Sequence, residues 1–382
     1  MGIKEFLRQR KEEGLLRKLK PASARRGCVI SFDGKEFIDF SSNDYLGFSR
    51  HPRLIEAGKK ALDEFGASSS ASRLLSGDLL IHHQLEEKTA RFKRKEAALV
   101  FNSGYQANVG IISALYGKGD CVFSDRLCHA SIIDGIFLSG AKHFRYRHND
   151  SSHLELLLKK ERGKFKRALV ITETVFSMDG DRALLGELVC LKEKYGCQLM
   201  VDEAHATGIF GKNGSGVVEE EGLEKKVDFI MGTFSKALGS FGAYFAASQE
   251  VKEYLINTCR SFIYSTGLPP AVIACSLEAL DLVKELPERR QALLKRAQYL
   301  RAALKEKGFQ AKGDSQIVPV VTGEAAQAVA LAEKLRLEGY WVLPIRPPTV
   351  PRGQACLRFS LSYFHEEEII KRLIGVMRNV RD

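Results

Sequence analysis

Short apolar runs recur along the chain and are mostly separated by amphipathic segments of helical length. Runs that fit the length of buried strands lie at residues 98–101, 121–123, 168–171, 199–201, 229–231 and 243–246. Continuous apolar runs of this length are typical of strands covered on both faces. Strands that alternate with helices predict an α/β fold in which helices flank a mainly parallel central sheet. Ligands of such sheets bind beyond the carboxyl ends of the strands, so the residues just after each run are the functional candidates.

The two ends of the chain follow a different pattern. Residues 3–19 have the pattern of an amphipathic helix, and residues 34–40 that of a strand. Beyond residue 270, a long helical pattern precedes apolar strands at 317–321 and 357–361. We therefore expect an N-terminal arm over residues 1–45, a large domain over 46–270 and a smaller α+β C-terminal domain over 271–382.

Composition and charge narrow the class of protein only in part. The 382 residues are 45% hydrophobic and 27% charged, which is typical of a folded globular protein and not of a disordered or fibrous one. The formal net charge is +11, with basic residues concentrated at 4–26 and 159–167. This charge favours a solvated surface over a specific binding role. Affinity for nucleic acid, for an anionic membrane or for an acidic small molecule such as a nucleotide-bearing thioester is the alternative.

The cysteines and the hydropathy pattern indicate the cellular compartment in which the protein works. The eight cysteines form neither a C-x-x-C pair nor a spacing typical of metal ligands, so we interpret them as reduced core thiols and expect no metal site. The N-terminus lacks the pattern of a signal peptide, and no apolar run approaches the roughly 18 residues that span a bilayer. We expect a cytoplasmic protein that binds neither membrane nor nucleic acid.

The most informative stretch carries an acid and, further on, an amine. The apolar run 199–201 delivers Asp202 at its carboxyl end, and Lys236 follows the run 229–231 in Thr-Phe-Ser-Lys-Ala-Leu-Gly. Pyridoxal phosphate needs both groups, because a carboxylate keeps its ring nitrogen protonated and a lysine forms an imine with its aldehyde and then serves as a base. Taken singly, Asp202 could be a helix cap and Lys236 a solvated lysine. Found together in these two motifs, they favour a catalytic pyridoxal-phosphate site over separate structural roles. The glycines after Lys236 fit a backbone that turns tightly beside a ring.

Other strand ends offer phosphate and ring contacts. Gly104 and Tyr105 open a helix after the run 98–101, and a helix N-terminus binds phosphate through its amides. Taken alone, this segment is more often an ordinary strand-to-helix turn. His129 fits a ring-stacking group or a structural histidine. The remaining candidates carry hydroxyl or imidazole groups: Ser177, His205 and Thr233.

In these motifs the whole chain resembles the α-oxoamine synthase family of fold-type I pyridoxal-phosphate enzymes. The matching segments are 41–47 (Ser-Ser-Asn-Asp-Tyr-Leu-Gly), 104–108, 201–208, 233–239, 264–266 and 345–351 (Ile-Arg-Pro-Pro-Thr-Val-Pro). Segment 345–351 is most similar to the biotin-pathway members of the family. The resemblance implies a fold-type I transferase and a homodimer with pyridoxal 5'-phosphate as cofactor. It further implies a decarboxylative condensation of L-alanine with pimeloyl-CoA or a pimeloyl acyl carrier protein.

The resemblance also implies residue roles. Lys236 is expected to form the Schiff base, Asp202 to pair with the ring nitrogen and His129 to stack on the ring. The rest of the expected cofactor site comprises Gly104, Tyr105, Ser177, His205, Thr233 and, from the neighbouring subunit, Thr266. The expected substrate contacts are Arg17, Asn43, Thr349 and the carboxylate clamp Arg358. Alternation along 357–361 puts Arg358 opposite the apolar residues, but a solvated edge arginine also fits. Arg17 lies in a basic segment, so general attraction for the thioester's phosphates explains it as well.

Three alternatives remain. Glycine C-acetyltransferase, which joins glycine to acetyl-CoA, belongs to the same family and differs in the residues that line the pocket. An aminotransferase would need Lys236 to pass the proton to the cofactor's own carbon. A basic nucleic-acid-binding protein is disfavoured, because the sequence has no zinc knuckle, no recognition-helix signature and no alternation of basic and aromatic residues.

Overall fold

The computed structural model describes residues 2–381 and divides the chain into two units. The small unit comprises residues 1–47, 178–181 and 291–382, and the large unit comprises residues 48–177 and 182–290. The boundaries expected from the sequence, after residues 45 and 270, stay a prediction.

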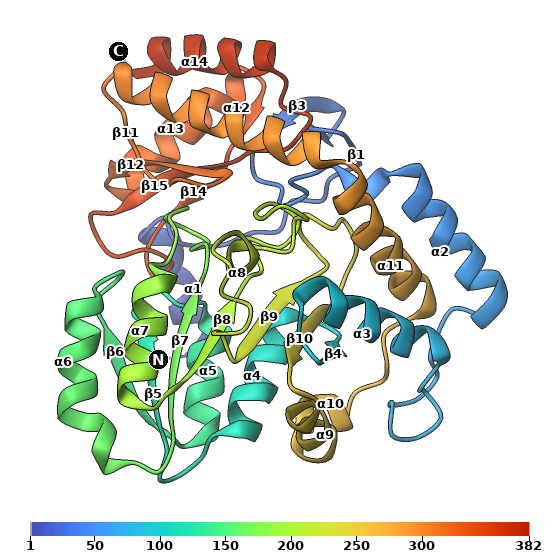
Figure 1. Cartoon of the computed structure of the whole chain (residues 1–382). Coiled ribbons are helices and arrows are strands. Elements are labelled where there is room, and N and C mark those ends of the chain that lie inside the picture. Colours follow the sequence, from blue (N-terminus) through green and yellow to red (C-terminus); the bar gives the residue numbers. More distant parts are fainter. Residues whose placement is uncertain (1, 382) are drawn as a thin grey trace. The chain divides into compact units, whose positions relative to one another are not determined.

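The large unit is built on a seven-stranded sheet with the order β4-β10-β9-β8-β7-β5-β6 (Figure 1). Its strands are β4 (Ala97–Phe101), β5 (Cys121–Asp125), β6 (Lys142–Tyr146), β7 (Ala168–Glu173), β8 (Gln198–Asp202), β9 (Phe229–Thr233) and β10 (Ala243–Ala247). β10 runs antiparallel to both of its neighbours, and the other pairs of adjacent strands are parallel. The prediction of a mainly parallel sheet is therefore confirmed, and every apolar run proposed as a strand in this unit is one.

Helices cover both faces of this sheet. They are α2 (Pro52–Phe65), α3 (Leu80–Lys93), α4 (Gly104–Leu115), α5 (Ala130–Ser139), α6 (Ser151–Glu161), α7 (Leu185–Tyr195), α8 (Val217–Glu220), α9 (Gln249–Thr258), α10 (Arg260–Ile263) and α11 (Pro270–Glu285). α4 packs on α5 and contacts β9 and β10, while α3 contacts β4, β10 and α11. The unit is thus a three-layer α/β structure.

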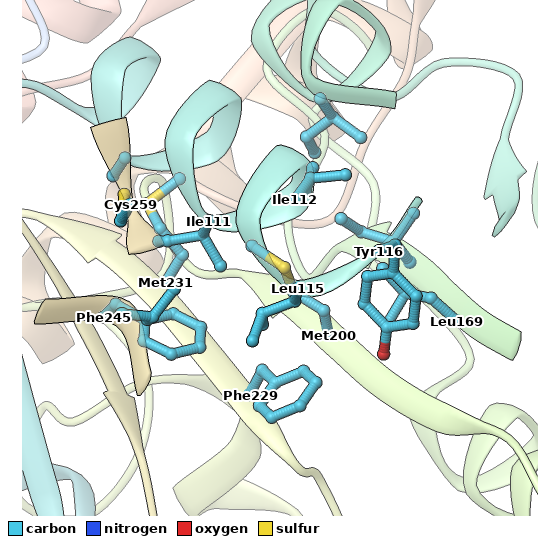
Figure 2. Close-up of a cluster of buried hydrophobic side chains, with 14 of the residues drawn as sticks. Ile111, Ile112, Leu115, Tyr116, Leu169, Met200, Phe229, Met231, Phe245 and Cys259 are labelled. Carbon is cyan, nitrogen blue, oxygen red and sulfur yellow. The ribbon is translucent and has the colours of Figure 1, made fainter. Parts of the chain in front are cut away.

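The core under α4 is almost entirely apolar. Figure 2 shows Ile111, Ile112 and Leu115 of α4 facing Met200 and Met231 from the sheet. All five side chains are buried, and fully burying one such side chain contributes about 1.5–3 kcal/mol. This cluster fixes α4 against the sheet, and with it the start of the helix.

The small unit contains two four-stranded sheets and its own helices. One sheet has the order β1-β2-β3-β13 and the other β11-β12-β15-β14. The strands are β1 (Ala24–Arg26), β2 (Val29–Phe32), β3 (Lys35–Asp39), β11 (Gln310–Ala311), β12 (Ile317–Gly323), β13 (Tyr340–Trp341), β14 (Pro344–Ile345) and β15 (Ala355–Ser360). The helices are α1 (Ile3–Glu12), α12 (Pro287–Glu306), whose first turn holds the unit boundary, α13 (Ala325–Leu337) and α14 (Glu367–Arg381).

Two local expectations were wrong. The N-terminal helix ends at Glu12 and not near residue 19, because Gly14 takes a φ of +66°, which terminates an α-helix. Cys190 is exposed, so it is not a core thiol. The expected tight turn after Lys236 is present, since Gly239 and Gly242 take φ values of +63° and +94°. A Cβ on Gly239 would also come within 2.4 Å of the Ser49 amide nitrogen.

Within residues 2–381, no helix is both long enough and apolar enough to cross a membrane.

Candidate active site

The sheet of the large unit changes from apolar to polar at the carboxyl ends of its middle strands. On the face that α4 covers, β7, β8 and β9 end in Glu173, Asp202 and Thr233. Each of the three lies two residues after a member of the apolar cluster, so its side chain continues the same face. The hydrophobic pattern that packs α4 therefore also delivers these polar groups to one edge.

A cavity of about 200 Å³ lies at this edge. The predicted cofactor residues that line it are Gly104, Tyr105, His129, Asp202, His205, Thr233 and Lys236. Its other lining residues are Asn108, Ser131, Glu173, Ala204, Met231 and Ser235. The structure thus brings an amine, a carboxylate and two imidazoles from three separate segments around one space.

Asp202 is buried and held by two donors. The Asn108 side chain donates from Nδ2 to Asp202 Oδ2 at 3.0 Å, and the Ala204 amide donates to Oδ1 at 2.9 Å. Asp202 is only 4% exposed. The two donors fix the orientation of the Asp202 carboxyl group in the cavity wall.

His129 is oriented by Ser131. Its Nδ1 accepts hydrogen bonds from the Ser131 amide at 3.3 Å and the Ser131 hydroxyl at 2.8 Å, which leaves Nε2 to carry the proton of the neutral ring. Partial burial, joined by the charge of Lys236, lowers the pKa of His129, while Asp202 opposes the shift. Asn108 donates to the Ser131 hydroxyl at 2.9 Å, so one amide links the histidine to the carboxylate.

Lys236 is positioned by a histidine. Its Nζ lies 2.9 Å from His205 Nε2, within hydrogen-bond distance. His205 itself is buried, in the turn that follows Asp202. The amine is therefore directed by the same turn that carries the acid.

Two features of the cavity suit an anion. α4 begins at Gly104 after Ser103, whose hydroxyl accepts the Gln106 amide at 3.2 Å, so the first amides of the helix point out of its N-terminus. The Thr233 hydroxyl lies 2.6 Å from that of Ser235, and Thr233 also donates to the Gly242 carbonyl. A phosphate at this helix end would meet backbone amides without needing a cation, close to the Thr233 and Ser235 hydroxyl groups that line the same cavity.

Taken together, the donor set fits pyridoxal phosphate. Lys236 and Asp202 line one cavity, as a ring held between an amine and a carboxylate requires. One polar atom of the cavity wall, Glu173 Oε1, is buried without a hydrogen-bond partner among residues 2–381, so a bound ligand could supply its partner. No group of three or more side chains in the same range is arranged to hold a metal ion.

Two predicted cofactor residues do not line this cavity. Ser177 lies four residues after Glu173, and its amide approaches the Glu173 carboxyl. Thr266 forms a bridge with Ser72, and its carbonyl accepts the Asn102 side-chain amide at 2.9 Å. Their roles stay predictions.

In the small unit, Arg358 lies in a buried polar cluster. β15 is an inner strand between β12 and β14, and Arg358 is 8% exposed, so the alternative of a solvated edge arginine was wrong. Its guanidinium donates to the Ser360 hydroxyl at 2.9 Å and to Asn43 Oδ1 and the Tyr45 hydroxyl at 3.4 Å. Arg358 and Asn43, both predicted as substrate contacts, therefore lie together.

The other two predicted substrate residues also meet within the small unit. Arg17 donates to the Thr349 hydroxyl at 3.2 Å, and both side chains are exposed. They line an open cavity of about 870 Å³ between the segments 6–19 and 343–349, which carries apolar side chains and the cations Arg10, Arg17, Lys18 and Arg346. An acyl chain with a phosphate-bearing carrier matches this mixture of surfaces.

Sequence reasoning missed Asn108, Ser131 and Glu173. Each lies two to four residues from a predicted site residue, so spacing on the helix or strand was the available signal. The signal was weak, because a polar residue near a strand end is more often a cap or a solvated group. Only the fold shows that all three are buried at one cavity.

Comparison with known proteins adds a family. Residues 35–376 match the family model described as aminotransferase class I and II. The chain is 50% identical to the 8-amino-7-oxononanoate synthase of Geobacter sulfurreducens over 98% of this chain and 96% of that protein. Serine palmitoyltransferase (SPT) of Sphingomonas wittichii superimposes with a TM-score of 0.93 at 35% identity over 98% of this chain and 96% of the other. A structure of SPT with a PLP internal aldimine gives 0.92 at 34% identity over 99% and 96%.

Proposed function

The chain belongs to the class I and II aminotransferase family, and from that premise we propose that it joins L-alanine to a pimeloyl thioester with loss of carbon dioxide, as an 8-amino-7-oxononanoate synthase of biotin biosynthesis does. Its cofactor is pyridoxal phosphate, and it is an acyl-transferring enzyme. The observation that carries the proposal is the shared cavity of Lys236 and Asp202.

Bound pyridoxal phosphate supplies an electron sink for the charge released when an amino acid loses a proton or carbon dioxide. Lys236 acts as the base that removes the α-proton of alanine, with His205 holding Nζ in place. Asp202 remains ionised between its two donors and pairs with the protonated ring nitrogen. His129 stacks on the ring and presents Nε2 to oxygen atoms that become negative during the condensation.

Phosphate and substrate contacts complete the proposal. The N-terminal amides of α4 at Gly104 and Tyr105 bind the cofactor phosphate, with Thr233. Arg358 binds the alanine carboxylate with Asn43, since a guanidinium pairs with a carboxylate through two hydrogen bonds. Arg17 and Thr349 contact the acyl donor.

We infer a homodimer as well. Thr266 is bridged to Ser72, and the adjoining segments expose Leu75 and Tyr264 at 79% and 72%. Large exposed apolar side chains next to a predicted phosphate contact are typical of a subunit interface. In such a dimer, Ser177 completes one cofactor site and Thr266 reaches the phosphate of the other. A cytoplasmic location is proposed on the sequence alone.

The first test is cofactor binding. Wild-type protein titrated with pyridoxal phosphate is expected to gain a visible absorbance band that Lys236→Ala lacks. Lys225→Ala, a substitution of an exposed lysine outside the cavity, serves as the matched control and retains the band. A band that survives in Lys236→Ala would overturn the assignment.

The second test is substrate choice. Alanine, glycine and serine are each combined with pimeloyl-CoA, pimeloyl carrier protein, acetyl-CoA and palmitoyl-CoA, and carbon dioxide and thiol release are measured. The expected result is the highest kcat/KM with alanine and a pimeloyl donor. Preference for glycine with acetyl-CoA would instead identify a glycine C-acetyltransferase, and keto acid formed from alanine without thioester would identify an aminotransferase.

A further inference from the structure

The cofactor cavity contains a second buried carboxyl group that the proposed chemistry does not use. Glu173 is the last residue of β7, and its register partner on β8 is Asp202. Partners on adjacent parallel strands project to the same face of a sheet, so both acids point towards the cavity that both line. Glu173 is 3% exposed and Asp202 4%. Two buried carboxyl groups this close repel each other when both are ionised.

The two acids are held differently. Asp202 accepts side-chain and backbone hydrogen bonds on both oxygens. The amides of His129 and Ser177 approach the Glu173 carboxyl, but Glu173 Oε1 is buried without a hydrogen-bond partner in the described part of the chain. A buried polar atom of this kind in a cavity wall is explained when a ligand supplies its partner.

Charge decides which acid keeps a proton. Two adjacent buried carboxylates do not both ionise at neutral pH. Burial and then the charge of Asp202 raise the pKa of Glu173 to about 8, while Lys236 and the two amides oppose the shift. The other titratable groups that face Glu173 are His129 and the Cys128 thiol at the start of α5, and burial raises the pKa of that thiol. Near pH 7, Glu173 is therefore the acid of the pair that keeps its proton.

We propose that Glu173 is a further cofactor-site residue whose neutral carboxyl group donates a hydrogen bond to an acceptor oxygen of the molecule bound in the cavity. A neutral acid offers one O–H donor, which an ionised carboxylate lacks. The acceptor belongs either to pyridoxal phosphate or to the amino acid joined to it. The inference rests on the proposed function, because it takes the cofactor as the occupant of the cavity.

The test compares Glu173→Gln with Glu173→Leu by titrating the cofactor-free protein with pyridoxal phosphate, and then the loaded protein with alanine. Glutamine keeps a donor and the shape of a neutral acid, so both dissociation constants are expected within about threefold of wild type at pH 7. Leucine removes the donor and leaves the buried acceptor without a partner, which predicts at least about tenfold weaker binding of one ligand. Weaker cofactor binding places the acceptor on the cofactor, and weaker alanine binding alone places it on the amino acid.

The pH profile separates this role from a merely structural one. Wild-type affinity for the affected ligand is expected to fall above about pH 8, where Glu173 ionises, and Glu173→Gln is expected to lack that fall. Thr172→Val is the matched control, because Thr172 is buried in the same strand but projects to the opposite face. It is expected to behave as wild type in all three measurements.

Either of two results would overturn the inference: Glu173→Leu binds both ligands as wild type does, or Glu173→Gln is impaired as severely as Glu173→Leu. Thermal unfolding of each variant checks that it is folded. Failure of the proposed function looks different, because wild-type protein would then bind no pyridoxal phosphate through Lys236.

Discussion

Lys93 and Glu203 form a buried ion pair inside the large unit, and Glu203 directly follows the cavity residue Asp202 in the sequence. Lys93 ends α3 and is 1% exposed, and its Nζ lies 2.7 Å from Glu203 Oε2 and 3.2 Å from the Thr207 hydroxyl. Glu203 is fully buried and also accepts the Val218 amide at 3.0 Å. Burial lowers the pKa of Lys93, but the Glu203 carboxylate and Tyr244 together outweigh burial, so the pKa is raised. Lys93 therefore keeps its charge in this buried site, paired with the Glu203 carboxylate.

Replacing Lys93 with methionine leaves Glu203 buried without its counter-ion. Removing one partner of a buried pair costs about 3–5 kcal/mol, because the remaining charge stays desolvated. For a unit of this size, about 2–4 °C of melting temperature corresponds to each kcal/mol, so we expect Lys93→Met to melt on the order of 10 °C lower. Adding Glu203→Gln removes the stranded charge and keeps an acceptor for the Val218 amide. The double variant is expected to recover at least about half of the loss.

Thermal unfolding followed by circular dichroism measures these shifts. Lys88→Met is the matched control on the same helix, since Lys88 pairs with Asp281 at 2.5 Å but the pair is 21% and 41% exposed. A partly exposed pair is worth about 0–1 kcal/mol, so this control is expected to melt within a few degrees of wild type. The reasoning fails if Lys93→Met is as stable as Lys88→Met, or if the double variant is no more stable than the single one.

Three further predictions concern the cofactor cavity of the large unit and the buried polar cluster around Arg358 in the small unit. Asn108→Ala removes the 3.0 Å hydrogen bond to Asp202 and is expected to weaken pyridoxal phosphate binding about threefold to tenfold, and unchanged affinity in a titration would contradict this. Arg358→Lys loses the fork that grips a carboxylate, so the KM for alanine should rise at least about tenfold while the cofactor absorbance stays the same; an unaltered KM would remove Arg358 from the substrate site. Because the pKa of Glu173 is raised from an ordinary 4.5 to about 8, its contribution to stability is complete below pH 4.5 and is lost as pH rises to 8. The free energy of unfolding of Glu173→Gln relative to wild type should therefore increase between pH 5 and 8, by at most about 1.4 kcal/mol per pH unit, and parallel profiles in urea denaturation would refute the sign.

The sequence determined the strands of the central sheet and the main chemical groups of the site. Continuous apolar runs have no plausible place except a covered sheet, and polar residues directly after them must fall at its carboxyl edge. The edge strand β6 was not predicted, because its sequence contains Lys142 and Arg145 and is not a continuous apolar run. An edge strand need not be covered on both faces. Lys236 and Asp202 were found because their chemistry is specific to one cofactor.

Only the tertiary structure decided what each polar side chain faces. Asp202 and Glu203 are adjacent acids in the sequence, yet alternation along the strand sends the first to Asn108 under α4 and the second to Lys93 under α3. The same packing turns Glu173 from an ordinary strand-end residue into a buried neighbour of Asp202. These partners are brought together by segments that lie 15 or more residues apart in the chain, through burial that no local pattern specifies. Periodicity determines which face of its own strand or helix a residue occupies. Which charged side chain it contacts on that face depends on how elements distant in the sequence pack.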